Sequence, residues 1–172
     1  MKSFQFNTTA GLRVGSGRAT DTAPEVLHKL GKKILFITDP GLKKLGLIDK
    51  TIGALKKNSE VIIFDRVEAD PSLKTLMNVV EVGKEFEATG VIGFGGGSSM
   101  DVAKLSALLL GSNEDIEEAW GVANAKGPRL PLVLYPTTAG TGSEVTPISI
   151  ITVGGDEKKG VSSPVILPDL AI

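Results

Sequence analysis

Short apolar runs of strand length alternate with segments of helical period along this chain of 172 residues. Apolar residues recur at helical spacing in residues 42–55 and again in residues 73–80, between such runs. Parallel strands need a crossover connection, which is usually a helix. The order therefore predicts an α/β fold, a Rossmann-like, doubly wound parallel sheet with right-handed crossovers. The runs that we interpret as buried strands are residues 33–38, 61–64, 91–92 and 132–135.

A glycine-rich turn joins the third of these runs to the helix that follows it. Residues 95–98 read Gly-Gly-Gly-Ser, and the helical period resumes at Val102. The first N–H groups of a helix lack internal partners and carry the positive end of the helix dipole. Because three successive residues without a Cβ let a phosphate approach these groups, the turn predicts an anion site. Ser98 and Asp101 have the spacing of a capping box, which predicts that Ser98 caps the helix.

The turn matches neither of two familiar nucleotide-binding fingerprints. Ser98 stands where G-x-G-x-x-G needs its last glycine, and no acidic residue closes a strand about 20 residues later. The turn also lacks the G-K-[ST] ending of the loop that grips nucleoside triphosphates. A plain glycine-rich turn is therefore the competing interpretation, and the ligand has to be argued from other parts of the chain.

A second candidate loop follows the strand at residues 132–135. Residues 136–146 carry five hydroxyl groups between small residues, which can donate to a diphosphate or a sugar. Asp39 follows the strand at residues 33–38 in the same way. Ligands of doubly wound sheets bind beyond the carboxyl ends of the strands. We therefore expect Asp39, the glycine turn and this loop to form one site, although the loop taken alone could simply be flexible.

The two ends of the chain give weaker signals. Residues 4–8 alternate like an edge strand, and residues 12–14 are a candidate hairpin partner for it. Residues 147–153 and 158–163 flank a Gly-Gly-Asp turn and predict a β-hairpin. Residues 164–172 read as an extended segment that stops without a cap or polar tail. That abrupt end suggests that the natural chain continues.

Composition excludes several classes of function. The formal net charge of −1 gives no electrostatic footprint for nucleic acid or an anionic membrane. The absence of cysteine excludes disulfides and thiolate zinc sites and agrees with a cytoplasmic location. The first residues lack the apolar core of a signal peptide, and no apolar run approaches the roughly 20 residues of a membrane span. His28, the only histidine, is expected to face solvent, and no clustered carboxylates indicate a metal site.

Three motifs together closely resemble the iron-containing (group III) alcohol dehydrogenase family, and the resemblance covers the whole chain. They are Gly95-Gly96-Gly97-Ser98-x-x-Asp101-x-Ala103-Lys104, the Pro136–Val145 stretch Pro-Thr-Thr-Ala-Gly-Thr-Gly-Ser-Glu-Val, and Pro168-Asp169-Leu170-Ala171-Ile172. The resemblance implies that residues 1–172 are the family's N-terminal dinucleotide-binding domain. In the family an all-helical domain follows and holds a divalent metal, iron or zinc, through an aspartate and three histidines. We expect that domain and those ligands to be absent from this chain.

The resemblance also implies roles for single residues. Asp39 matches the acidic residue beside the adenine ribose, where a carboxylate accepts from the ribose hydroxyls and repels a 2′-phosphate, so NAD is favoured over NADP. Lys159 matches a lysine that reaches toward the ribose near the nicotinamide. Asp101 and Lys104 match the first motif, but capping the helix and packing the loop is an alternative role for them. The residues that match the pyrophosphate turn and the threonine-rich wall of the cofactor site are Gly95, Gly96, Gly97, Ser98, Thr137, Thr138, Thr141 and Thr146.

As a function, the resemblance implies hydride transfer between a small alcohol or aldehyde and NAD by the full-length protein. This chain alone is expected to lack turnover, because it ends before the family's metal ligands. A homodimer is possible, whereas nucleic-acid and membrane partners are not expected. Two alternatives stay open: a relative on the same scaffold, such as glycerol dehydrogenase, a lactaldehyde or diol oxidoreductase or maleylacetate reductase, and a stand-alone nucleotide-binding module without catalysis.

Overall fold

The computed structural model describes residues 7–172 and contains a five-stranded parallel sheet in the order β2-β1-β3-β5-β8. All four neighbouring pairs in this sheet are parallel, which confirms the predicted α/β class. The order corresponds to the flavodoxin-like version of the doubly wound fold, whose switch point lies between the first and third strands. The strands are β1 (Lys33–Ile37), β2 (Glu60–Phe64), β3 (Gly90–Gly95), β5 (Leu132–Pro136) and β8 (Leu170–Ala171).

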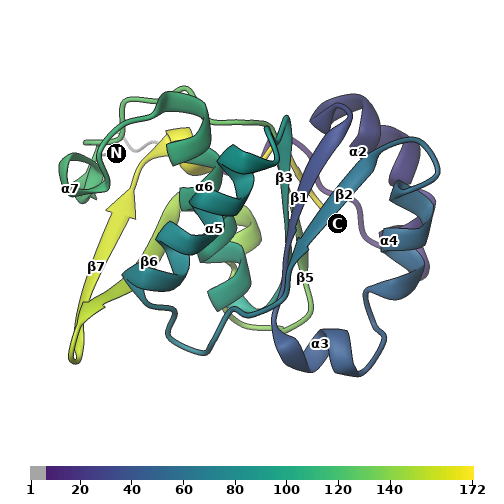
Figure 1. Ribbon diagram of the computed structural model, residues 1–172, viewed down its shortest axis with the longest axis horizontal. Coiled ribbons are helices and arrows are strands. Elements are labelled where there is room, and N and C mark those ends of the chain that lie inside the picture. Colours follow the sequence, from purple (N-terminus) through teal and green to yellow (C-terminus); the bar gives the residue numbers. More distant parts are fainter. Residues whose placement is uncertain (1–6) are drawn as a thin grey trace, which may run out of the picture.

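Helices cover both faces of this sheet (Figure 1). One face packs against α2 (Ala23–Leu30) and α4 (Asp49–Leu55), and the opposite face packs against α5 (Leu73–Glu85) and α6 (Gly97–Ser112). Successive strand residues point to opposite faces, so each strand contributes to both cores. In β1, for example, Ile34 and Phe36 join the core of α2 and α4, and Leu35 and Ile37 join the core of α5 and α6. This double burial explains why the strands appear as continuous apolar runs.

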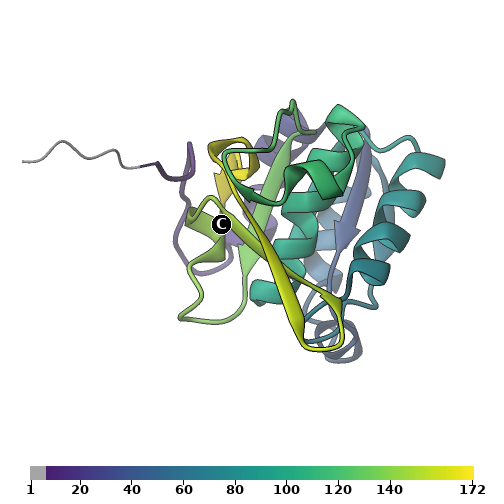
Figure 2. The same ribbon diagram turned by 90° about the vertical axis from the view of Figure 1, so that its left-hand side faces the viewer.

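A second, smaller sheet has the order β4-β7-β6 and includes the predicted hairpin. Strands β6 (Ile148–Gly154) and β7 (Glu157–Ser162) pair antiparallel, and the hairpin lies across α6 (Figure 2). Ile151 and Val161 bury their side chains in the same core as α5 and α6. Strand β4 (Gly121–Val122) was not predicted, because two residues are too short to show a period.

The shorter elements complete the chain. Helix α7 (Ile116–Ala119) is short and acidic and is capped by Asp115, and Ser72 caps α5. His28 is exposed, as predicted. The remaining elements are α1 (Arg18–Asp21), α3 (Pro40–Lys44) and the 3-10 turns η1 (Ser143–Val145) and η2 (Pro164–Ile166).

The helical spacing of residues 42–55 does not belong to one helix. Helix α3 ends at Lys44, and α4 begins at Asp49. Gly46 lies between them with φ 68°, a left-handed conformation that glycine adopts without steric cost and that turns the chain. The break leaves Leu45 and Leu47 exposed instead of packed.

The predicted capping box at Ser98 is wrong. Gly96 occupies the N-cap of α6 in an extended conformation, the helix begins at Gly97, and no side chain caps it. The Asp101 carboxylate accepts hydrogen bonds from Ser143 and from the backbone of Ile150 instead. The first N–H groups of α6 are thus left without a side-chain partner, which suits an anion site better than a capped helix would.

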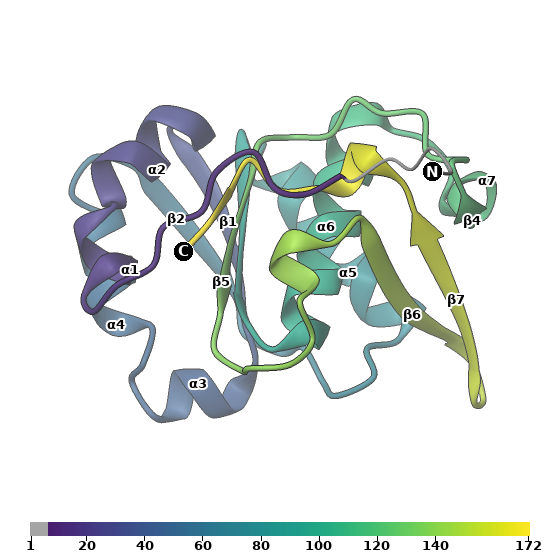
Figure 3. The same cartoon turned by 180° about the vertical axis from the view of Figure 1, so that it is seen from behind.

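A segment near the start of the described chain, residues 11–13, runs alongside its last strand at Ala171 (Figure 3). Leu12 forms a parallel bridge with Ala171, and residues 4–6 of the edge strand predicted to pair with residues 12–14 lie outside the described residues. The segment predicted as extended at residues 164–172 contains η2 before it joins the large sheet as β8. Within residues 7–172, every helix is too short or too polar to cross a lipid bilayer.

Candidate functional site: a cleft at the carboxyl ends of the strands

The glycine turn lies between Asp39 and the threonine-rich loop. A Cβ placed on Gly95 would lie 3.3 Å from Asp39 Oδ2, and one placed on Gly96 would lie 3.5 Å from Thr138 Oγ1. A Cβ on Gly97 would lie 3.2 Å from Thr141 Cγ2. Because β1, β3 and β5 are neighbours in the sheet, the loops that follow them meet at one edge. The structure therefore brings together the three segments that the sequence predicted to converge.

Gly95 is the position at which this convergence needs glycine. Its φ is 153°, which L side chains rarely adopt, and a Cβ there would approach Ser99 Oγ to 2.7 Å. Ser99 itself is buried and belongs to the first turn of α6. A side chain at residue 95 would thus displace the start of the helix from the end of β3.

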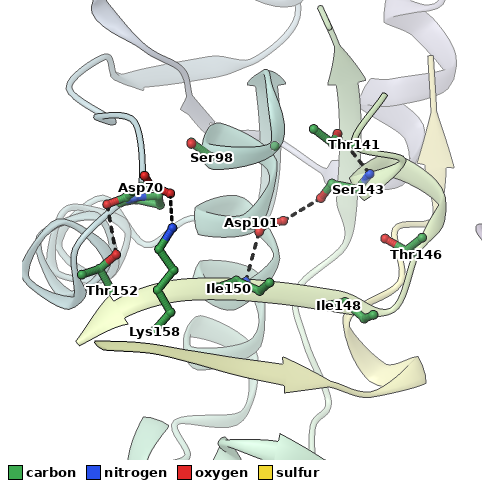
Figure 4. Close-up of a pocket in the computed structure, with 12 residues that line it drawn as sticks. Asp70, Ser98, Asp101, Thr141, Ser143, Thr146, Ile148, Ile150, Thr152 and Lys158 are labelled. Atoms are coloured by element: carbon green, nitrogen blue, oxygen red, sulfur yellow. Dashed lines mark hydrogen bonds and ion pairs between the residues drawn. The ribbon is translucent and has the colours of Figure 1, made fainter. Parts of the chain in front are cut away.

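Two hollows flank the turn. The first, which we call the Asp39 hollow, has a volume of about 630 Å³, and the second, the hairpin hollow, has a volume of about 470 Å³ (Figure 4). Ser98 lines both of them, so they adjoin at the N-terminus of α6. The Asp39 hollow is lined chiefly by Asp39, Leu42, Leu45, Leu47, Gly96 and Thr138, and the hairpin hollow by Gly97, Asp101, Thr141, Thr146, Ile150 and Lys158.

Asp39 is held in place as the N-cap of α3. Its Oδ1 atom accepts hydrogen bonds from the backbone N–H groups of Gly41 at 2.9 Å and Leu42 at 3.0 Å. These bonds fix the carboxylate and leave Oδ2 on the side of Gly95, facing the cleft. A strand end followed by Asp-Pro-Gly thus produces both the helix cap and an oriented acceptor.

Glu68 is a second carboxylate in the Asp39 hollow that sequence reasoning missed. It accepts hydrogen bonds from Ser72 and from the Thr75 hydroxyl. Burial alone would raise the pKa of Glu68, but these hydrogen bonds outweigh it and hold the pKa below its ordinary value. The Glu-x-x-x-Ser spacing before α5 was the signal available in the sequence.

Asp101 connects α6 to the far wall of the hairpin hollow. Its Oδ1 accepts from Ser143 Oγ at 2.7 Å, and its Oδ2 accepts from the backbone N–H of Ile150 at 3.0 Å. Burial raises the pKa of the Asp101 carboxyl, although the bond from Ser143 and the nearby Lys104 act in the opposite direction. Asp101 thus holds η1 and β6 against α6. This resembles the loop-packing role that the sequence offered as the alternative to cofactor binding.

The structure places Lys158, and not Lys159, at the cleft. In the hairpin register Lys158 pairs with Thr152 and Lys159 with Ile151, so the two lysines face opposite sides of the small sheet. Lys158 lines the hairpin hollow, where its Nζ lies 2.5 Å from Asp70 Oδ1. Lys159 lines neither hollow.

On the inner side of the hairpin, Lys159 has other partners. Its Nζ lies 3.2 Å from Glu117 Oε2 and 6.0 Å from the centre of the Trp120 ring. The buried Ile151 opposite it was the available signal, because cross-strand partners share a face.

The other predicted residues divide between the two hollows. Thr137 and Thr138 line the Asp39 hollow with Gly96, and Thr141 and Thr146 line the hairpin hollow with Gly97. Within residues 7–172, no group of three histidine, aspartate or glutamate side chains is placed to hold a metal ion.

These features define a Rossmann-like α/β domain with a cleft at its switch point. The family model for iron-containing alcohol dehydrogenases matches residues 11–172, and the chain belongs to that family.

Comparison with single proteins agrees with this assignment. The chain is 37% identical over 173 residues to a sulfoacetaldehyde reductase from Bilophila wadsworthia, a match that covers 99% of this chain and 44% of that protein. A crystal structure of a 1,3-propanediol oxidoreductase superimposes with a TM-score of 0.93 at 29% identity, covering 99% of this chain and 45% of the other. A sulfoacetaldehyde reductase from Bifidobacterium kashiwanohense in complex with NAD+ superimposes with a TM-score of 0.86 at 27% identity, covering 99% and 46%. The chain thus spans less than half the length of the relatives it matches.

Proposed function

We propose that the two hollows together bind one molecule of NAD, and that residues 1–172 act as the dinucleotide-binding domain of a metal-dependent alcohol dehydrogenase. One observation carries this proposal: Asp39 and the threonine-rich loop approach the same glycine turn from opposite sides. The uncapped N-terminus of α6, a helix of 16 residues, lies where the hollows adjoin. Its free N–H groups suit the pyrophosphate that links the two halves of a dinucleotide.

The Asp39 hollow fits the adenosine half. Asp39 Oδ2 is available to accept from ribose hydroxyls, and its charge would repel the 2′-phosphate of NADP. Leu45 and Leu47 are 72% and 57% exposed and line this hollow. Burial of such exposed apolar surface under an adenine ring would favour binding. A relative with NAD+ in its crystal structure supports the choice of cofactor.

The hairpin hollow fits the nicotinamide half. Lys158 takes the place that the sequence prediction gave to Lys159, because its side chain is the one on the cleft side of β7. Its ammonium can donate to ribose hydroxyls, and Thr141 and Thr146 can donate from the opposite wall. When bound, NAD accepts or donates a hydride at its nicotinamide ring. The role of the residues in this chain is to bind and orient that ring.

Turnover needs residues beyond these. No described cluster fits a metal, so we assign the metal, iron or zinc, to the rest of the full-length protein. We infer that this chain alone binds NAD without converting alcohols. The substrate is proposed to be a small alcohol or aldehyde, as the names of a sulfoacetaldehyde reductase and a methanol dehydrogenase among the relatives indicate for those proteins. A cytoplasmic location and a homodimer stay predictions of the sequence.

Calorimetric titration with NAD and NADP tests the cofactor assignment. We expect Asp39→Asn to weaken NAD binding about tenfold, because it removes a charge-assisted hydrogen bond. It should also narrow the preference for NAD over NADP, because the carboxylate charge that repels the 2′-phosphate is lost. The substitution keeps an oxygen that can cap α3. Asp115→Asn is the matched control, because the Asp115 carboxylate also caps a helix, accepting from the backbone N–H of Glu117, and lines neither hollow. An unchanged ratio of NAD to NADP affinity in Asp39→Asn would contradict the assignment.

Addition of zinc or ferrous ion, NAD and a short alcohol to the chain tests the separation of binding from catalysis. We expect no growth of the absorbance of reduced nicotinamide. Sustained NADH production would show that the chain catalyses the reaction by itself. A chain that binds no dinucleotide at all would overturn the proposed function.

A further inference from the structure

A fully buried lysine lies directly behind the wall of the hairpin hollow. The side chain of Lys104 projects from α6, and its exposed fraction is 0%. A lysine is almost never fully buried unless its charge is compensated, because removing an ammonium from water is costly. The environment of this ammonium therefore has to supply partners for each of its N–H groups.

Three acceptors surround the Lys104 ammonium. Its Nζ donates to Ser143 Oγ at 2.9 Å, to the carbonyl oxygen of Thr146 at 2.9 Å and to the carbonyl oxygen of Ile148 at 2.8 Å. An ammonium has three donors, so all of them are used. All three acceptors lie within residues 143–148, the segment that leads from the threonine-rich loop into β6.

The same segment forms part of the cleft. Ser143, Thr146 and Ile148 line the hairpin hollow (Figure 4). Lys104 does not line the hollow, but it bonds to these three wall residues. Ser143 also donates to Asp101, which lies one turn earlier on α6. The start of the segment is therefore tied to the same helix whose N-terminus carries the glycine turn.

Filling space does not explain this lysine. An apolar side chain of similar length would fill the same volume without the cost of desolvating a charge. What an apolar residue cannot do is hold two carbonyl oxygens and a hydroxyl at fixed positions. The ammonium therefore determines where residues 143–148 lie relative to α6.

We propose that Lys104 is a positioning residue for the dinucleotide site, which sets the distance between the threonine-rich wall and the glycine turn at the N-terminus of α6. The inference rests on the proposed function and extends it to a residue that touches no cofactor. It goes beyond the packing role that the sequence left open, because it ties the geometry of the cleft to one buried charge.

The charge state of Lys104 provides a specific signature. Burial lowers the pKa of Lys104 from 10.5 to about 8, against the opposing effect of the two carboxylates that act on it, Asp101 on α6 and Glu144 on η1. A neutral amine has only two N–H donors, so one of the three bonds is lost above that pH. We therefore expect affinity for NAD to fall as the pH rises through about 8.

Stability should change in the opposite direction over the same range. The pKa of Lys104 in the folded chain, about 8, is below the ordinary value of 10.5, so between these values the unfolded chain binds more protons. Stability rises with pH wherever the unfolded state binds more protons. A residue with a merely structural role would not weaken NAD binding while the fold becomes more stable.

Calorimetric titration with NAD at several pH values between about 7 and about 9.5, together with thermal unfolding, tests the inference. We expect Lys104→Met to weaken NAD binding about tenfold at neutral pH and to abolish the pH dependence. Arg129→Met is the matched control. Its guanidinium also bonds to carbonyl oxygens, those of Leu130 and Leu167, but at the opposite edge of the sheet. It should lower the melting temperature and leave NAD affinity unchanged.

Lys158→Met separates the two lysines near the hairpin hollow. It should weaken binding but keep the pH dependence, because Lys104 is intact. If Lys104→Met does not fold, the wild-type profile decides: affinity that stays constant across this pH range overturns the inference, as does a folded Lys104→Met chain with wild-type affinity. If the wild-type chain binds no NAD at any pH, the proposed function fails first and this inference fails with it.

Discussion

The Asp39 hollow and the hairpin hollow are built by different physical means. The first is formed by loops that directly follow neighbouring strands, so the topology of the sheet alone brings its residues together. The second requires the small sheet to pack against α6, through polar contacts of Asp101 and Lys104 with segments about 40 residues away. The comparison teaches that one half of a binding cleft can follow from chain order while the other depends on a few long-range polar contacts.

A substitution where the two hollows adjoin should have the largest effect. We expect Gly95→Val to abolish measurable NAD binding and to lower stability, because a Cβ there meets Ser99 Oγ and the backbone is in a glycine conformation. Calorimetry and thermal unfolding give the two readouts.

Gly53→Ala provides the glycine control for this experiment. Gly53 lies in α4, where a Cβ meets nothing within 4 Å, so alanine should stabilise the helix by up to about 1 kcal/mol. NAD affinity should not change. Wild-type affinity in Gly95→Val would show that the turn does not form the centre of the site.

The adjacent lysines of β7 sharpen the account of the hairpin hollow. We expect Lys158→Met to weaken NAD binding about fivefold, a modest loss because the lysine is exposed to solvent. Lys159→Met should leave affinity unchanged, since Lys159 pairs with Glu117 on the other face. Titration of both variants with NAD measures the difference. The reverse ranking would show that the register of the hairpin differs in solution.

The smallest effect on the cleft is expected from the ion pair between Arg129 and Asp169, which lies at the amino ends of the strands. Burial alone would raise the pKa of Asp169, but hydrogen bonds from Arg129 and from the backbone of Leu132 lower it below 3.8. Between the lowered pKa and 3.8 the unfolded chain binds more protons than the folded chain. The stability that Asp169 contributes is therefore present above about pH 4 and is lost as the pH falls toward the lowered pKa.

Acid unfolding of Asp169→Asn checks that expectation. The variant should lose the part of the acid-dependent stability that Asp169 contributes, while its NAD affinity at neutral pH stays that of the wild type. Weakened NAD binding in a stable Asp169→Asn chain would mean that the two edges of the sheet are coupled.

Much of the fold was predictable because its signals are local. The strands around Phe36 and Leu134 are apolar on both faces, which only a covered parallel sheet explains. The break at Gly46 was missed, because the leucine period continues across it. The cap at Ser98 was predicted wrongly, because the spacing of Ser98 and Asp101 cannot show that Asp101 bonds to residues more than 40 positions later.

The candidate site also has parts that local signals predict and parts that they do not. The convergence of Asp39, Gly96 and Thr138 follows from strand order and was predicted. The choice between Lys158 and Lys159 depends on a hairpin register that a one-residue shift would invert. The burial of Lys104 had no local signal, since a lysine in a helix normally extends into solvent.

Titration of the isotope-labelled chain with NAD, followed by NMR of its backbone amides, tests the central claim most directly. One ligand bridging both hollows should shift the amides of Gly96 and Gly97, of Thr138 in the first hollow and of Thr141 and Lys158 in the second, all with a single dissociation constant. Shifts confined to one hollow, or two sets with different constants, would contradict the account.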